Sequence, residues 1–243
     1  MWGLFRLANR RWQAANGECT LRLARRLLSF TTLLALVNAA PVRSAPELSL
    51  AFYDQQGQPL ADVVVSVSGI PVTQTAPPVA VMDQVNKQFR PSVLVVQKGQ
   101  SVSFPNSDNI RHHVYSFSSP KTFEIRLYAD TPKDPVLFDK PGLVVLGCNI
   151  HDQMIGYIYV ADSAYTFISD KQGHITLPSL PASSTLSIWH PRLSLSESER
   201  QTMTRQELNA MPVRNGRIQI TLTLAVAAAV QQEEQSFGNK LRR

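Results

Sequence analysis

The sequence contains little cysteine, with two residues in 243, Cys19 and Cys148. We expect Cys19 to be removed with the N-terminal segment, which leaves one thiol in the mature chain. A single thiol cannot form an internal disulfide, so a fold held together by disulfides is excluded. An unpaired thiol in an oxidising compartment also reacts unless something occupies it, so the surroundings of Cys148 decide its role.

Long hydrophobic runs are also missing. The most apolar stretch near the N-terminus, residues 27–37, is shorter than the ~20 residues that a membrane-spanning helix requires. It follows an arginine-rich segment that ends at Arg26, and small residues follow it at Ala39, Ala40 and Ala45. This order is typical of a secretory signal peptide. We therefore predict removal of residues 1–45, export to the periplasm, and no membrane attachment of the mature chain.

Without residues 1–45, the chain has no excess of positive or negative charge. The whole chain has a formal charge of +6, but residues 1–45 contain seven arginines and one acidic residue. The remainder has 17 basic and 17 acidic residues. A neutral chain has no extended basic surface to attract nucleic acid or anionic lipid, so we expect no nucleic-acid partner.

Convincing helical periodicity is lacking, and short alternating segments take its place. Examples are residues 93–96, 101–104, 113–117 and 122–128, separated by turn residues such as Lys98-Gly99. Short strands at intervals of about 8–12 residues indicate a β-sandwich, here of roughly 80 residues.

The flanking regions predict a second, smaller β-sandwich. Residues 46–69 look like a hairpin with strands at 48–53 and 62–68, and further strands are expected after residue 164, with a short helix around residues 204–210. We expect the two flanking regions to pack together, with the other sandwich inserted between them. The predicted boundaries are 1–45 for the signal peptide, 46–78 with 162–226 for the small sandwich, 79–161 for the inserted domain and 227–243 for a flexible tail.

One loop gathers chemically distinctive side chains. Cys148, His151 and Met154 follow each other in the pattern C-x2-H-x2-M, between apolar segments at 143–146 and 155–160. Thiolate and thioether sulfur select copper, and imidazole suits both copper oxidation states. The loop lacks a second imidazole, which the pair His112-His113 could supply. Adjacent residues of a strand point to opposite faces, so only one of these two can be a ligand.

Residues 79–161 resemble blue-copper cupredoxins of the plastocyanin type. Asn106, Asp108, His112 and Val114 match that family's N-x-D-x3-H-x-V pattern, and the short C-x2-H-x2-M loop resembles the amicyanin group, which serves methylamine utilisation. The resemblance implies a Greek-key sandwich and one type 1 copper. It favours His112 over His113 and implies the ligand set His112, Cys148, His151 and Met154. Where the family commonly has Asn after the first ligand, this chain has His113.

Residues 170–191 resemble carboxypeptidase-regulatory-like sandwiches, which supports the prediction of a second β-domain. With the copper loop, this gives an all-β chain made of a cupredoxin-like sandwich and a smaller sandwich.

The function expected from these features is that of a monomeric periplasmic electron carrier, not an enzyme, which exchanges single electrons with redox partner proteins. Family members transfer electrons at the edge of the loop histidine, here His151, and Ile110, Ile150 and Ile155 are candidates for an apolar patch around it. Two alternatives stay open: a copper-binding or delivery protein without redox cycling, and a metal-free interaction module. A Cys–His hydrolase is disfavoured because no G-x-S-x-G motif occurs, and zinc because a thioether binds it weakly.

Overall fold

The computed structural model describes residues 47–68, 77–193 and 200–225. Within these ranges the regular secondary structure is almost entirely β-strand, with one short helix, α1 (Arg205–Asn209). The all-β prediction is therefore confirmed, and so is the short helix expected near residue 204. The predicted signal peptide and the predicted C-terminal tail lie outside the described residues. No helix in the described ranges has the length and hydrophobicity needed to cross a membrane.

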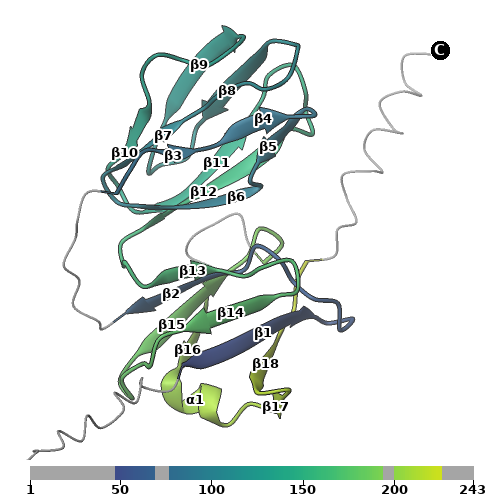
Figure 1. Cartoon of the computed structure of the whole chain (residues 1–243), viewed down its shortest axis with the longest axis vertical. Helices are drawn as coiled ribbons and strands as arrows, with labels where there is room; N and C mark the ends of the chain where they lie inside the picture. Colours follow the sequence, from purple (N-terminus) through teal and green to yellow (C-terminus); the bar gives the residue numbers. More distant parts are fainter. Residues whose placement is uncertain (1–46, 69–76, 194–199, 226–243) are drawn as a thin grey trace, which may run out of the picture. The chain divides into compact units, whose positions relative to one another are not determined.

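The residues that contain the candidate loop form a mixed five-stranded sheet (Figure 1). Its order is β6 (Val93–Gln97), β12 (Ile155–Ala161), β11 (Gly142–Gly147), β8 (His112–Ser116) and β9 (Phe123–Tyr128). The pair β6–β12 is parallel, and the other neighbours are antiparallel. The loop that contains Cys148 and Met154 joins β11 to β12. Because β8 lies next to β11, His112 at the start of β8 comes from the strand beside this loop.

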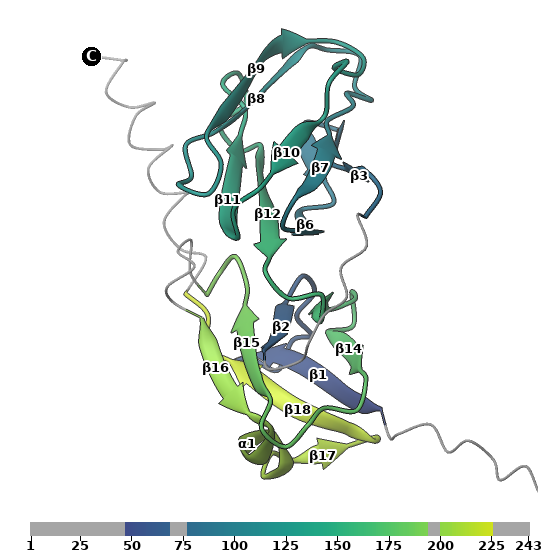
Figure 2. The same ribbon diagram turned by 90° about the vertical axis from the view of Figure 1, so that its left-hand side faces the viewer.

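A smaller sheet covers this one. Its order is β10 (Val136–Phe138), β7 (Gln100–Ser103) and β3 (Ala80–Val81), and a separate hairpin joins β4 (Asp83–Val85) to β5 (Gln88–Arg90). Figure 2 shows β10, β7 and β3 in one layer, opposite β8, β11 and β12. The connections from β7 to β8 and from β9 to β10 each lead from one sheet to the other, as in Greek-key sandwiches. The sandwich predicted from the spacing of the strands is thus present.

The alternation of residues along β8 positions the candidate histidines. His112, Val114 and Ser116 are buried, whereas His113 and Tyr115 are partly exposed, because successive strand residues point to opposite faces. The buried face joins an apolar core that both layers share. This core contains Val102, Phe104, Val114, Phe138, Val144, Leu146, Cys148, Met154 and Ile158.

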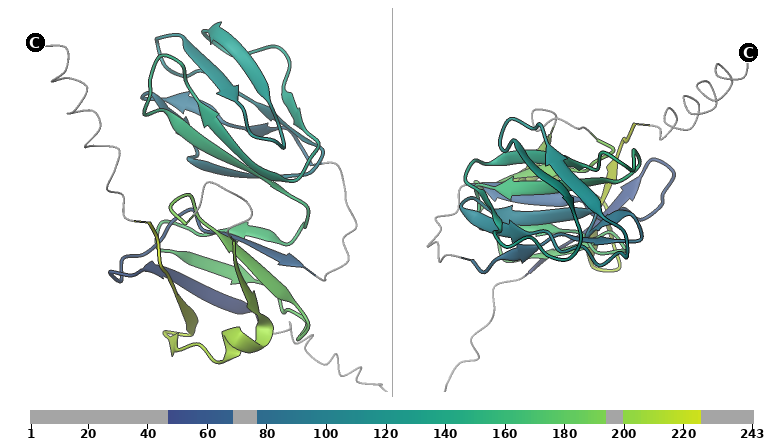
Figure 3. Two further views of the ribbon diagram at one scale, coloured as in Figure 1. Left: turned by 180° about the vertical axis from the view of Figure 1, so that it is seen from behind. Right: turned by 90° about the horizontal axis from the view of Figure 1, so that it is seen from above.

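The remaining strands form two four-stranded sheets. One has the order β14 (His174–Leu177), β1 (Leu48–Asp54), β18 (Arg217–Leu222) and β17 (Val213–Arg214). The other has the order β13 (Thr166–Ile168), β2 (Val64–Ser68), β15 (Thr185–Trp189) and β16 (Gln201–Thr204). The first strand therefore pairs in parallel with the last one, and Figure 3 shows the purple and yellow-green strands side by side.

The predicted hairpin at residues 46–69 is wrong in its pairing, although both of its strands exist. β1 lies in one sheet and β2 in the other. Most residues of both strands are buried. Strands of this kind are paired along both edges and covered on both faces. Leu50 and Phe52 of β1 and Val65 and Val67 of β2 meet in one core cluster instead of across a ladder.

Candidate metal centre

His112 is the first residue of β8, and its side chain is completely buried. The alternating segment expected from the sequence starts at residue 113, but the ladder with β9 already begins at His112, which pairs with Tyr128. A register shift follows directly, between His112 and Val114. The imidazole of His112 is therefore attached to a strand and packed in the core, and this packing limits its rotation.

The loop between β11 and β12 brings the other donors to the same place. β11 ends at Gly147, so Cys148 is the first residue of the loop, as predicted. A turn closes it, in which the backbone N–H of Met154 donates to the carbonyl of His151 at 2.9 Å. Cys148 is a free thiol and is buried. His151 is half-buried, and Asp152 and Gln153 are exposed, as expected for loop residues.

Three potential ligand atoms converge at this point. Cys148 Sγ lies 3.9 Å from His112 Nδ1 and 3.8 Å from His151 Nδ1. The nitrogen and sulfur atoms of this group all lie within 4.8 Å of one another. The two imidazole rings are 5.1 Å apart between centroids and tilted by 58°. Three of the four residues predicted as ligands are thus brought together.

These separations fit a metal ion. Typical bonds of about 2.3 Å to a thiolate and about 2.0 Å to an imidazole nitrogen, in a trigonal plane, put sulfur and nitrogen about 3.7 Å apart. The two sulfur–nitrogen distances in this structure, 3.9 Å and 3.8 Å, are close to that value. The spacing of one thiolate and two imidazoles is therefore compatible with a single metal ion between them.

Met154 is the fourth residue of the predicted set. It is 1% exposed and belongs to the same apolar core as Cys148. Its position just before β12 places it at the end of the loop that contains Cys148 and His151. A buried thioether next to this group is consistent with a weak axial ligand, and its ligation stays a prediction.

His113 faces away from the cluster. Its Nε2 lies 3.1 Å from Oε1 of Glu124 on β9, and its ring is 5.6 Å from that of Tyr115. Of the two adjacent histidines, His112 is therefore the one that points to Cys148, and the alternation along β8 gives the reason.

Asp108 is a functional candidate that the sequence indicated only as part of a motif. Its Oδ2 lies 2.7 Å from Nε2 of His112, the ring nitrogen that does not face Cys148. Burial raises the pKa of Asp108, but hydrogen bonds from the backbone of Lys87, from His112 and from the backbone of Asn86 outweigh it, so the pKa lies below its ordinary value. A signal was present in the sequence, since Asp108 stands four residues before His112.

Tyr128 closes the cluster on the side of β9. Burial raises its pKa to about 12, so the phenol stays protonated at neutral pH. The hydroxyl donates to the carbonyl of Phe104 at 2.8 Å and accepts from Nε2 of Gln84. Tyr128 therefore anchors the loop that leads to His112 and is not in the ionised form that binds a metal.

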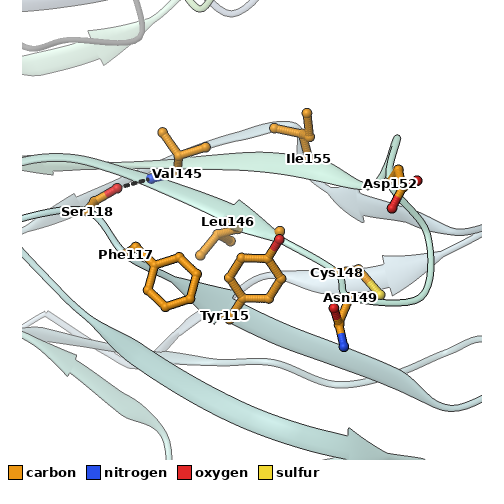
Figure 4. Close-up of a pocket in the computed structure, with 10 residues that line it drawn as sticks. Tyr115, Phe117, Ser118, Val145, Leu146, Cys148, Asn149, Asp152 and Ile155 are labelled. Atoms are coloured by element: carbon orange, nitrogen blue, oxygen red, sulfur yellow. Dashed lines mark hydrogen bonds between the residues drawn. The ribbon is translucent and has the colours of Figure 1, made fainter. Parts of the chain in front are cut away.

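The outer face of the sheet is hollowed beside Cys148. Figure 4 shows the ring of Tyr115 on β8 beside the ring of Phe117, which directly follows this strand, with Val145 of β11 and Ile155 of β12 above them. Ser118 holds the edge of this hollow by accepting a hydrogen bond from the backbone of Val145 at 2.9 Å. Phe117 and Ile155 are exposed, so apolar surface lies close to the cysteine.

No protein-family model and no curated protein matches the sequence. Among solved structures, a copper-containing nitrite reductase from Thermus scotoductus SA-01 matches with a TM-score of 0.34 and 25% identity. The match covers 40% of this chain and 25% of the reductase, so it spans about a quarter of that protein.

Two further solved structures match along almost their whole length. A purple cupredoxin from Nitrosopumilus maritimus has a TM-score of 0.31 and 19% identity, over 34% of this chain and 99% of the cupredoxin. A mutant of amicyanin in its reduced form has a TM-score of 0.30 and 17% identity, over 40% of this chain and 98% of amicyanin. Each match covers less than half of this chain.

Proposed function

We propose that the chain is a cupredoxin-type electron carrier that holds one type 1 copper through His112, Cys148 and His151. The observation that supports it is the convergence of three donor atoms within 4.8 Å of one another. Soft thiolate with imidazole is the donor set that copper prefers, and a His2Cys plane with a weak axial Met is typical of electron-transfer sites. Met154 is the proposed axial residue.

When bound, copper would supply a one-electron couple between Cu(I) and Cu(II). The protein would keep its ligands nearly fixed, because any rearrangement between the two states slows electron transfer. His112 is buried and bonded to Asp108, Cys148 is packed in the core, and the loop is closed by the bond between Met154 and His151. Rigid donors that a packed scaffold holds in place satisfy this requirement.

His151 would be the point of electron exchange, because it is the one of the three donors that is not buried. Its neighbour Ile150 is 48% exposed, and Ile155 is 50% exposed. Apolar side chains around an exposed ligand favour brief contact with a redox partner protein. In this proposal the mature chain is an exported periplasmic monomer that carries electrons without catalysing a reaction.

The test is an absorption titration of the mature chain with Cu(II). The proposal predicts an intense visible band, from charge transfer between the Cys148 thiolate and Cu(II), that saturates at one equivalent. The same titration of Cys148→Ala should give no such band. A colourless Cu(II) complex of the unaltered chain would refute the proposal, and failure to take up copper would favour a metal-free interaction module.

A second candidate is a copper-binding or delivery protein with the same ligands and no redox cycle. The orientation of His113 favours it, because the imidazole is directed to Glu124 on β9 and not to the Cys148 loop. Voltammetry separates the two functions. A carrier gives a reversible one-electron wave, whereas a delivery protein keeps Cu(I) without reversible oxidation.

A further inference from the structure

Asp108 takes part in three hydrogen bonds, and in two of them its carboxylate accepts from a backbone N–H group. Its Oδ1 accepts from the backbone N–H of Asn86 at 2.6 Å, and its Oδ2 accepts from that of Lys87 at 2.9 Å. Oδ2 also lies 2.7 Å from Nε2 of His112. Backbone N–H groups only donate, so both carboxylate oxygens already act as acceptors. The arrangement therefore suits an ionised carboxylate and leaves no place for an amide NH2.

The turn between β4 and β5 supplies the two backbone donors. Asn86 and Lys87 have φ angles of +54° and +57°, as in a two-residue type I′ hairpin turn. The hairpin is tied to the segment around Asp108, because Ser107 donates from Oγ to Asp83 at 2.8 Å and from its backbone to Gln84 at 3.0 Å. The carboxylate is thus held from both sides, by its own segment and by the turn.

The position of the carboxylate determines the tautomer of His112. An ionised carboxylate has no proton to donate, so Nε2 of His112 must carry the hydrogen that they share. In the neutral ring, Nδ1 then keeps its lone pair, and Nδ1 is the atom that lies 3.9 Å from Cys148 Sγ. Asp108 therefore prepares the nitrogen that faces the cluster for ligation.

We propose that Asp108 is a positioning residue that locks His112 in the Nε2–H tautomer and lowers the reduction potential of the copper that His112 would bind. The first part needs no metal, and the second rests on the proposed function. A carboxylate bonded to a ligand imidazole makes the imidazole more basic. Its negative charge also interacts more favourably with Cu(II) than with Cu(I), because the attraction grows with the charge of the ion.

The first experiment uses the copper-free mature chain. Nitrogen NMR of 15N-labelled histidine, assigned through His112→Gln, reports which ring nitrogen carries the proton. The proposal predicts a single Nε2–H tautomer for His112. In Asp108→Asn, the tautomers should become mixed or reversed. A native spectrum in which His112 is Nδ1–H, or a mixture, would overturn the proposal, and this outcome does not depend on whether Asp108→Asn folds.

The second experiment uses the copper-loaded chain and a matched control. Asp108→Asn should shift the reduction potential to a more positive value and weaken Cu(II) binding by about 10- to 100-fold. Asp152→Asn removes a charge from the exposed part of the ligand loop without contacting His112, and it should change both quantities much less. Equal potentials for Asp108→Asn and the unaltered chain would contradict the second part.

The two failures are distinguishable. If the chain binds no copper or gives no visible band, the proposed function fails, while the tautomer of His112 still tests Asp108. If the chain is a blue copper protein with a potential insensitive to Asp108, the proposed function stands and the role of Asp108 in setting the potential is refuted.

Discussion

Tyr115 lies directly opposite Gly147 in the β8–β11 pair, and its phenol ring covers the glycine. A methyl group at Gly147 would lie 2.7 Å from Cζ and 2.8 Å from the hydroxyl of Tyr115. A second glycine of this kind is Gly156 in β12, the strand that follows the Cys148 loop. A methyl group at Gly156 would lie 2.7 Å from Cβ of Phe89. The two glycines differ in how easily the neighbour can move.

Substitution of these glycines should therefore have unequal costs. Gly147→Ala pushes on the outer end of a partly exposed ring, so we expect a loss of about 1 kcal/mol of unfolding free energy. Gly156→Ala pushes on the Cβ of a buried phenylalanine, so we expect a loss of about 2–3 kcal/mol. Urea denaturation of both variants checks the order, and a larger loss for Gly147→Ala would contradict it.

The two adjacent histidines should differ in copper binding. His112→Ala removes a donor that faces Cys148, so it should weaken Cu(II) binding by more than the ~10–100-fold typical of losing a neighbour of a ligand. His113→Ala removes a ring directed to Glu124 and should keep one tightly bound copper. Competition titrations with a copper chelator measure both affinities. Equal losses of Cu(II) affinity in the two variants would contradict the assignment of His112 as the histidine that faces Cys148.

The exposed apolar residues near His151 should control contact with another redox protein. Ile150→Glu introduces a charge at this surface, and two like charges meet when two copies approach through it. Electron self-exchange between Cu(I) and Cu(II) forms, measured by NMR line broadening, should slow by about tenfold or more, with an unchanged visible spectrum. Val213→Glu, on the exposed strand β17, is the control. An unchanged rate in Ile150→Glu would rule out this surface.

His190 gives a prediction that is independent of copper. Burial and, to a smaller extent, the charge of Arg192 lower the pKa of His190 from its ordinary value of 6.5 to about 4, against opposing effects of Asp62 and the backbone of Ala61. Between pH 7 and pH 5 the unfolded chain gains a proton at this residue and the folded chain does not. Stability is therefore complete above about pH 6.5 and decreases as the pH falls toward 4, by about 2 kcal/mol at pH 5.

The measurement is urea denaturation at pH 7 and pH 5. His190→Gln should remove most of the difference between the two pH values, while His174→Gln, on β14, should preserve it. If His190→Gln keeps the full difference, the imidazole is not responsible for the loss of stability in acid.

Local pattern predicted that Cys148 and His151 lie close together. Cys148, His151 and Met154 lie in one loop, and the apolar segments on either side could only be strands, so their proximity followed from the spacing. The choice of His112 needed the family resemblance in addition, because the sequence alone does not say which face of β8 is buried. The structure shows the buried face to be that of His112 and Val114.

Contacts between distant segments were not predictable in the same way. The prediction of a hairpin at residues 46–69 was wrong because a sequence shows where strands are but not whether successive strands pair. The turn at Asn86-Lys87 was missed because lysine gives no signal for positive φ, and the role of Asp108 depends on that turn. The contact of Tyr115 with Gly147 arises from a register that only the assembled sheet defines.

X-ray absorption at the copper edge of the mature chain, loaded with one equivalent of copper, tests the central claim most directly. The predicted first shell has one short bond to the sulfur of Cys148 and two bonds to imidazole nitrogens, of His112 and His151, with the sulfur of Met154 at a longer distance. Cys148→Ala should lose the short sulfur bond, and His113→Ala should leave the shell unchanged. A shell without sulfur in the unaltered chain, or with a single imidazole, would contradict the assignment of this metal centre.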